Sequence, residues 1–466
     1  MPSQPSERFP YRDELELPVI GLESEFKPFV DGAEVVPEEV WRTPSAFIDR
    51  PLLKRTTKSS QLPTGGAVYF DGGVIEVVTP VIEIAPHCTA RVVRSLWEQI
   101  TFLREQLDRW EVRSGHRVTL QAYSCHFNIS FELGRDERSR NRTVQKLAYL
   151  LAHLLPVPVI VTGANRRSTG MGVRPRRERI EITLDFTPDP GLMAATTALI
   201  VGVVREVISW PSYRLEDVER MPIPLIAGVE PGKHATRKGW LARAQHFPRN
   251  PFQAQLDERI WETRNGERLS LREIALGTAM YFRDSIRRYA DPFSYRLLFS
   301  ILRGETPSLL DLPDRPAAYD DVGRETRWGS VLPDLENFAA LMNDADAGEG
   351  DGDARPARRR KADVDEKLSP PWSGDVGGAS DRRTAARPGS DRRMLPPPAP
   401  STRLTRSVYE KVFLKLGSGK RVTIGGELLT PVAVKGWYHS IFITPAGEER
   451  MLSIDQLVPY LGSWSD

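Results

Sequence analysis

The segment RPRRERIEITLDFTPDP, residues 174–190, decides the fold that we predict for this chain. Side chains along a strand point alternately to its two faces, so every second residue lies on the same side. The side chains on one face are all apolar: Ile180, Ile182, Leu184 and Phe186. The other face carries a guanidinium group, two carboxylates and a hydroxyl: Arg179, Glu181, Thr183 and Asp185. We predict a strand over 178–186 that buries its apolar face, although a solvated antiparallel strand alternates in the same way.

Three other segments separate polar from apolar residues in the same manner. Each is predicted to bury one face of a strand and to present carboxylate, imidazole or amide groups on the other. The segments are 18–26 with Glu23 and Glu25, 66–80 with Glu76, and 118–133 with His126 and Asn128. If all four strands lie in one sheet, these residues combine with Arg179 and Glu181 into a single surface, which we call the polar face.

Helical periodicity accounts for much of the remaining sequence. Apolar residues recur every three or four positions over 89–111, which is typical of a helix with one buried face. Further helices are predicted at 144–155, 192–210 and 271–289, then up to about 303 and near 333–343. A strand is predicted around 158–161 and a loop over 162–175. Strands backed by helices place the chain in the α+β class.

Changes in composition divide the chain into four parts. Residues 1–17 form a polar arm, and 18–343 form the main domain. Residues 344–400 contain almost no large apolar side chains, so we expect a disordered linker. In 401–466 short β-type runs return at 408–416, 421–424, 431–434 and 440–444, which predicts a small, mostly-β module.

Composition excludes several classes of protein. The 64 lysines and arginines nearly balance the 62 aspartates and glutamates. The net charge is therefore too small to favour binding to nucleic acid or to a membrane surface. The two cysteines, Cys88 and Cys125, offer neither a disulfide framework nor a metal-site spacing. The N-terminus is unlike a signal peptide, and the longest apolar run, about 192–204, is shorter than the roughly 20 residues of a spanning helix. We expect a soluble, cytoplasmic protein.

The polar face predicts metal and phosphate chemistry. Several carboxylates brought together repel one another, and a divalent cation would relieve that repulsion. Hard oxygen ligands with one imidazole suit Mg²⁺ or Mn²⁺, and arginines on the same surface suit phosphate contacts. The chain has neither a GxxxxGK[ST] loop nor a GxGxxG after a strand. The expected site is therefore one for a Mg-nucleotide on a sheet surface.

For each candidate residue of the polar face, and for the further candidates Asp71 and Glu83, an ordinary structural role is the alternative. The glutamates could belong to a solvated strand face, and His126 could be a satisfied core histidine. Asn128 could cap or bridge neighbouring groups. Asp71 precedes two glycines, where an aspartate is a natural turn residue. Glu83, seven residues past Glu76, could mark only the edge of the next helix.

The order of these motifs resembles the glutamine synthetase superfamily over about residues 18–210. RRERIEITLDFTPDP is similar to the segment in which an Arg-Ile-Glu strand precedes a Pro-Asp-Pro turn, and ANRR at 164–167 is weakly similar to the arginine loop upstream. GLESEF and SCHFNISF are similar to the paired-glutamate and His-x-Asn strands. YFDGGVIEVVTP resembles the segment of bacterial Pup ligases and Pup deamidases in which an Asp precedes a metal-binding Glu.

The resemblance implies a fold and a set of residue roles. It implies a glutamine-synthetase-like domain, with a curved, mostly antiparallel sheet backed by helices. Asp71 is expected to take the proton of an attacking amine, and Arg179 to neutralise the γ-phosphoryl group of ATP. Arg167 and Arg174 are expected to contact the nucleotide. The residues expected to hold two Mg²⁺ or Mn²⁺ ions are Glu23, Glu25, Glu76, His126 and Glu181.

The sequence departs from the family at two points. The pair Gly72–Gly73 replaces a more polar stretch after the aspartate of the Pup enzymes. Thr183 stands two residues past Glu181, where glutamine synthetases have a second arginine. A different contact to phosphate or substrate is therefore expected.

The predicted function is an ATP-dependent carboxylate–amine ligase that forms an amide through an acyl phosphate. Either substrate could be a protein, and the module at 401–466 could contact a protein partner. One alternative is a deamidase or isopeptidase that uses a nucleotide on the same scaffold, and net ATP turnover coupled to amide formation separates it from a ligase. The other alternative is a non-catalytic scaffold protein, which failure to bind Mg-ATP would favour.

We predict that limited proteolysis cuts within residues 344–400 and leaves two resistant fragments. A segment with so few apolar residues cannot offset the entropy lost on ordering, whereas the flanking parts contain enough apolar residues to fold. Mass spectrometry of a time course would identify the cut sites. Uniform protection across 344–400 would contradict the prediction.

Overall fold

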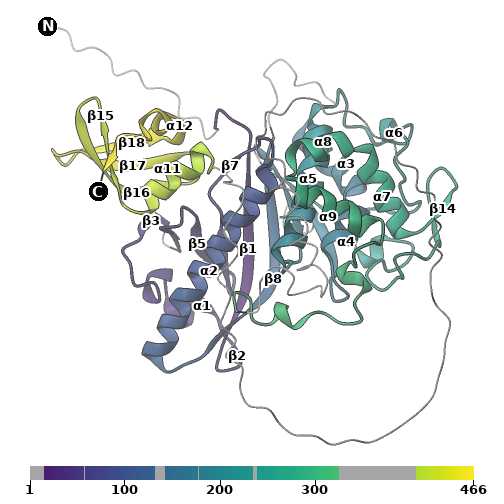
Figure 1. The fold of residues 1–466 in the computed structure, drawn as a ribbon, viewed down its shortest axis with the longest axis horizontal. Coiled ribbons are helices and arrows are strands. Elements are labelled where there is room, and N and C mark those ends of the chain that lie inside the picture. Colours follow the sequence, from purple (N-terminus) through teal and green to yellow (C-terminus); the bar gives the residue numbers. More distant parts are fainter. Residues whose placement is uncertain are drawn as a thin grey trace, which may run out of the picture. The chain divides into compact units, whose positions relative to one another are not determined.

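A large, mostly antiparallel sheet with helices packed against it forms the centre of the fold (Figure 1). The computed structural model describes residues 15–56, 58–131, 142–176, 178–234, 239–324 and 406–465. The predicted helix near 333–343, the predicted linker and most of the predicted N-terminal arm lie outside these residues. The α+β class predicted from the sequence agrees with the sheet and its helices.

The four strands predicted to carry the polar face lie in one sheet. In spatial order the central strands are β5 (Ala67–Asp71), β6 (Val74–Val78), β1 (Val19–Val30), β8 (Val118–Ser130), β10 (Arg179–Leu184) and β9 (Gly170–Pro175), all antiparallel to their neighbours. Beyond β5 lie β4 (Ser59–Gln61) and β3 (Leu53–Thr56), and beyond β9 lie β12 (Trp240–Arg243) and β11 (Gly232–Lys233). The sequence therefore predicted the neighbourhood of these strands correctly.

Helices bury the apolar face of the central strands. The residues Ile180, Ile182, Leu184 and Phe186 of the segment at 174–190 are at most 2% exposed. Helix α2 (Cys88–Ser114) packs on β1, β6 and β8, and α5 (Pro190–Ser209) packs on β8 and on α2. Further helices are α3 (Val144–Leu154), α7 (Leu271–Tyr281), α8 (Arg283–Tyr289) and α9 (Pro292–Leu302).

Helix α5 is longer than the apolar run identified in the sequence. By length and composition alone it could span a membrane, but 89% of its apolar window is buried inside the fold, as in a core helix. The helix begins at Asp189, whose side chain accepts hydrogen bonds from the backbone N–H groups of Gly191 and Leu192. Asp189 therefore fixes the point at which the chain leaves β10 and returns across the sheet.

Two sequence predictions between the helices were wrong. The segment around 158–161, predicted as a strand, belongs to α4, a helix at Pro156–Gly163. All eight of its residues are buried, so it shows no polar face from which a helical period could be recognised. The predicted loop over 162–175 contains β9, which pairs with β10.

The C-terminal segment begins with a helix instead of the predicted β-type run at 408–416. Ser407 and Glu410 form a capping box at the start of α11 (Val408–Gly417): each side chain accepts from the other residue's backbone N–H at 3.1 Å. The elements that follow are β15 (Arg421–Ile424), β16 (Glu427–Lys435), β17 (His439–Ile443), β18 (Glu449–Ser453), α12 (Ile454–Leu457) and β19 (Trp464–Ser465).

This C-terminal segment has its own apolar cluster, but it is joined to the main sheet. Phe413, Leu429 and Phe442 are fully buried within the cluster. Strand β16 pairs in parallel with β3, and the backbone N–H of Tyr409 donates to Glu83 Oε1 at 2.8 Å. The described residues 406–465 thus pack in one compact unit with the described residues up to 324. Their independent folding stays a prediction.

Short elements complete the fold. They are β2 (Ala33–Glu34), α1 (Pro37–Trp41), β7 (Ile82–Glu83), α6 (Leu215–Val218), β13 (Trp261–Glu262) and β14 (Arg268–Leu269), with 3-10 turns at Pro44–Ala46, Ala244–His246, Leu309–Asp311, Ala317–Tyr319 and Val458–Tyr460.

We predict that Gly202→Ala destabilises the protein, because α5 and α8 approach closely at this glycine. An added Cβ would lie 2.5 Å from Ile286 Cγ1 and 2.6 Å from Ile286 Cα, so the α8 backbone must shift. The free energy of unfolding in urea should fall by about 1–3 kcal/mol, the usual cost of overpacking. Gly462→Ala is the control, since a Cβ there meets nothing within 4 Å. Equal stability of the two variants would contradict the close packing of α5 on α8.

Candidate metal and nucleotide site

Strand register places a row of polar side chains directly opposite one another. The row runs across five neighbouring strands through Ser59, Tyr69, Glu76, Glu25 and Ser124. Residues paired across antiparallel strands point to the same face, with Cβ atoms about 4.5–5.5 Å apart. Glu25 and Glu76, which are distant in the sequence, therefore lie side by side.

A second group of polar side chains lies next to this row. Glu23 is paired with His126 across β1 and β8, and Glu181 is paired with Asn128 across β8 and β10. His126 Nδ1 lies 3.2 Å from Glu23 Oε2 and 4.0 Å from Glu181 Oε1. One ligand atom from each of Glu23, His126 and Glu181 lies within 4.8 Å of the others. This spacing suits the coordination of one ion.

His126 connects the two groups. Its Nε2 lies 3.9 Å from Glu25 Oε1 and 3.3 Å from the hydroxyl oxygen of Ser124, which donates to Glu25 Oε2 at 2.5 Å. The five residues predicted as metal ligands thus share one face of the sheet. Glu23 and Glu25 are at most 20% exposed and Glu181 is 1% exposed, so these side chains do not form a fully solvated strand face.

The carboxylates of the polar face carry more negative charge than the nearby cationic side chains balance. Burial, followed by repulsion from Glu23, Glu25, Asp71 and Glu181, raises the pKa of Glu76 to about 9. Burial also acts to raise the pKa of Glu23, but the hydrogen bond and charge of His126, helped by Arg179, outweigh it and lower that pKa. The excess of charge is therefore greatest between β6 and β1.

The predicted arginines Arg167, Arg174 and Arg179, together with the neighbouring Arg176, divide by what they contact. Arg174 and Arg176 both pair with Glu181, the Arg176 guanidinium at 2.7 Å from Oε2. Arg179 Nε donates to Asn128 Oδ1 at 2.7 Å. Arg167 is exposed in the loop before β9, and in the described part of the chain its side chain has no hydrogen bond or ion pair. Among the described residues, Arg179 and Arg167 are thus the predicted arginines that form no ion pair with a carboxylate, although the charge of Arg179 acts on Glu23.

The donor set fits a divalent cation. Carboxylate oxygens with one imidazole are the ligands that Mg²⁺ and Mn²⁺ accept. Thr183 Oγ1 is buried beside His126 without a hydrogen-bond partner among the described residues, so the polar face has unused hydrogen-bonding capacity. Both oxygens of Glu181 contact arginines. If Glu181 binds an ion, it would do so while its carboxylate still contacts Arg174 and Arg176.

Asp71 lies at the rim of the polar face. It ends β5 opposite Val74, and Gly72 and Gly73 form the two-residue turn with φ values of 61° and 92°. Asp71 is two residues from Tyr69 and so points to the same face as Glu76, where it is exposed. The aspartate thus occupies a turn position, and its charge acts on Glu76; its role as a base stays a prediction.

Three residues of the polar face were missed in the sequence. Ser124 and Tyr69 follow the same alternation as His126 and Asp71, two positions before each, so strand periodicity could have identified them. Arg55 also contacts this face through Tyr69. No local pattern identifies it. Glu83, a weaker candidate ligand, instead accepts the backbone N–H of Tyr409.

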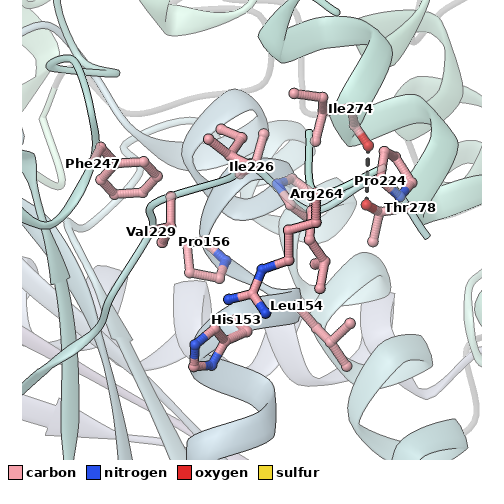
Figure 2. Close-up of a pocket in the computed structure, with 13 residues that line it drawn as sticks. His153, Leu154, Pro156, Pro224, Ile226, Val229, Phe247, Arg264, Ile274 and Thr278 are labelled. Carbon is pink, nitrogen blue, oxygen red and sulfur yellow. Dashed lines mark hydrogen bonds between the residues drawn. The ribbon is translucent and has the colours of Figure 1, made fainter. Parts of the chain in front are cut away.

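A separate pocket lies away from the polar face. Figure 2 shows its lining from the α3–α4 junction, including His153, Leu154 and Pro156, and from Arg264 and Ile226. Burial lowers the pKa of His153, whose Nδ1 lies 3.0 Å from the Tyr149 carbonyl oxygen. None of the predicted site residues lines this pocket.

Comparison with known proteins finds a structural likeness but no match in sequence. No family model matches the chain, and no curated protein matches it. Among solved structures, it is similar to the crystal structure of the complex between Prokaryotic Ubiquitin-like Protein Pup and its ligase PafA. The TM-score is 0.43 with 12% sequence identity, over 96% of this chain and 92% of that chain. A likeness at this level supports no conclusion about the activity of this chain.

We predict that Glu76→Gln flattens the pH dependence of stability in the metal-free protein. Because the pKa of Glu76 is about 9 in the fold against an ordinary 4.5, its contribution to stability is present below 4.5 and is lost as the pH rises through about 9. The free energy of unfolding of the wild type should therefore fall more steeply over this window than that of the variant.

Urea denaturation in EDTA at about pH 5, 7 and 9 measures this slope. Glu39→Gln is the control, since Glu39 is an exposed glutamate on α1. Its slope should match the wild type. Identical slopes for Glu76→Gln and the wild type would show that Glu76 is not crowded by negative charge.

Proposed function

We propose that this chain is an ATP-dependent carboxylate–amine ligase that uses Mg²⁺ or Mn²⁺. The observation that carries the proposal is the cluster of Glu23, His126 and Glu181 beside the pair Glu25 and Glu76 on one sheet face. Four carboxylates on neighbouring strands are costly without a cation. The order of motifs that resembles the glutamine synthetase superfamily supports the same conclusion.

The residues of the polar face would act mainly by position and charge. Glu23, His126 and Glu181 would hold one ion, and Glu25 with Glu76 would hold a second. Bound metal would neutralise the phosphates of ATP in phosphoryl transfer. Arg179, which is fixed by Asn128, would meet charge that develops on the transferred phosphoryl group. Arg174 and Arg176 would orient Glu181 instead of contacting the nucleotide directly.

Asp71 would act on the nucleophile. It is exposed at the rim and close enough to Glu76 for the two charges to interact. A carboxylate in this place, outside the proposed ligand set, can accept the proton of an attacking amine. The same carboxylate could activate water, which is the hydrolase alternative. Formation of an amide with matched release of ADP and phosphate would support the ligase, and amide cleavage without net ATP turnover would support the hydrolase.

We predict that Asp71→Asn and Glu25→Gln separate catalysis from binding. Asp71→Asn keeps the turn and removes the base, so ATP turnover should fall roughly 10²–10⁴-fold while Mg-ATP affinity stays unchanged. Glu25→Gln removes charge from the proposed ligand set and should weaken binding of Mn²⁺ itself. Calorimetry with Mn²⁺ and Mg-ATP, together with assays of ADP release, measures both effects.

Asp284→Asn is the matched control, because Asp284 is exposed on α8 away from the sheet. It should change neither turnover nor binding. Normal turnover by Asp71→Asn would reduce Asp71 to a turn residue. A wild-type protein that binds neither Mn²⁺ nor Mg-ATP would favour the non-catalytic scaffold.

A further inference from the structure

Arg55 reaches the polar face from a bulge in β3. The pairing of β3 with β4 is irregular between Lys54 and Thr56, which leaves Arg55 outside the regular ladder. Bulges of this kind redirect a side chain. Arg55 contacts Gln61 and Tyr69, and register places both of these on the same face as Glu76. The guanidinium group therefore lies at the edge of the proposed metal site.

Every group that holds Arg55 is neutral. Its Nε donates to the Tyr69 hydroxyl at 3.2 Å, one terminal nitrogen donates to Gln61 Oε1 at 2.6 Å, and the other donates to the Gly436 carbonyl at 2.7 Å. The ring of Trp437 lies 4.1 Å from the guanidinium carbon. These contacts fix the plane of the guanidinium and use three of its five N–H groups.

The charge of Arg55 has no counter-ion among the described residues. Arg174 and Arg176, by contrast, pair with Glu181. Burial lowers the pKa of Arg55, which is the expected effect when a cation leaves water without a carboxylate partner. A partly buried cation normally pairs with an anion. Held rigidly with two N–H groups unused, this guanidinium has the features of a receptor for an oxyanion.

We propose that Arg55 and Tyr69 bind an oxyanion, a carboxylate or a phosphate, of the molecule that reacts at the polar face. The proposal rests on the proposed function for the identity of that molecule, but not for the binding itself. Tyr69 stands opposite Glu76, so the bound oxyanion would lie next to the ions that Glu25 and Glu76 would hold. Gly436 and Trp437 come from the C-terminal segment, which would thereby complete the site by positioning Arg55.

A purely structural role makes a different prediction. If Arg55 only ties the turn at Gly436 to β5, its loss should loosen that turn and leave the affinity for anions unchanged. Arg55→Gln removes the charge but keeps donors to neutral acceptors. Arg55→Lys keeps the charge but loses the planar fork. Arg303→Gln is the control, since Arg303 is an exposed arginine after α9 whose ion-pair partner is Glu305.

The test is titration of the full chain with glutarate, inorganic phosphate and Mg-ATP, followed by calorimetry or NMR. The wild type should bind at least one of these oxyanions, and Arg55→Gln should weaken that binding roughly 10- to 100-fold, the worth of hydrogen bonds to a charged group. Arg55→Lys should lie between, and Arg303→Gln should match the wild type. Loss of glutarate binding with Mg-ATP binding retained identifies a carboxylate substrate, and loss of phosphate and Mg-ATP binding identifies the nucleotide.

Two outcomes overturn the proposal. One is a wild type that binds neither glutarate nor phosphate nor Mg-ATP. The other is an Arg55→Gln variant, folded by circular dichroism, that binds them as the wild type does; if that variant fails to fold, unchanged affinity in Arg55→Lys has the same meaning. Binding of Mn²⁺ alone reports on the proposed function separately, because Arg55 belongs to neither group of proposed ligands. If Glu25→Gln loses Mn²⁺ binding and Arg55→Gln still binds Mn²⁺ normally, the metal site is tested separately from the oxyanion site.

Discussion

Repulsion among carboxylates fixed on one sheet face is the constraint on which this structure depends. Glu76, Glu25, Glu23 and Glu181 are brought together by strand register, and helices on the opposite face hold that register. A slip of one residue would turn every glutamate into the core and every isoleucine outward. The same packing that stabilises the fold therefore enforces the crowding of charge.

Compensation for this charge is uneven across the sheet. At the β9 side Glu181 is paired with Arg174 and Arg176, and Glu23 is next to His126. At the β6 side, within the described part of the chain, the side chain of Glu25 accepts a hydrogen bond from the Ser124 hydroxyl and lies 3.9 Å from His126 Nε2, and the raised pKa of Glu76 reports the imbalance. Under the proposed function, a cation between Glu25 and Glu76 would relieve the most repulsion. An ion near Glu181 would have to compete with two arginines that are already in place.

The parts of the fold that alternate strictly could be predicted from the sequence. Residues 178–186 and 118–133 each have one apolar and one polar face, so both their strand character and their shared surface followed. Helix α4 could not be recognised, since Pro156–Gly163 is buried on all sides and the period of its pattern is lost. Helix α11 did carry a signal, the Ser407–Glu410 capping box, which the β-branched and aromatic residues after it obscured.

The site was predictable to the same extent as the strands that carry it. The predicted glutamates and His126 lie on strands in which apolar and polar residues visibly alternate. Their position on one common face could therefore be predicted from the sequence. Arg55 lies in a bulge, which breaks the alternation, and it is held by Gly436, 381 residues away. Contacts of that range leave no local pattern, because each partner is chosen by the fold and not by its neighbours in the chain.

The exposure of Asp71 bears on the direction of the chemistry. A base buried with the metal ligands would meet only the molecule that fits the site, whereas a base at the rim meets whatever approaches from solvent. Asp71 ends a two-residue hairpin and is exposed, while Glu76 on the next strand is largely covered. The carboxylate alone therefore does not select an amine over water. Under the proposed function, selection would have to come from whatever covers the rim when substrate is bound, so the choice between ligase and hydrolase would depend on access to Asp71 and not on its chemistry.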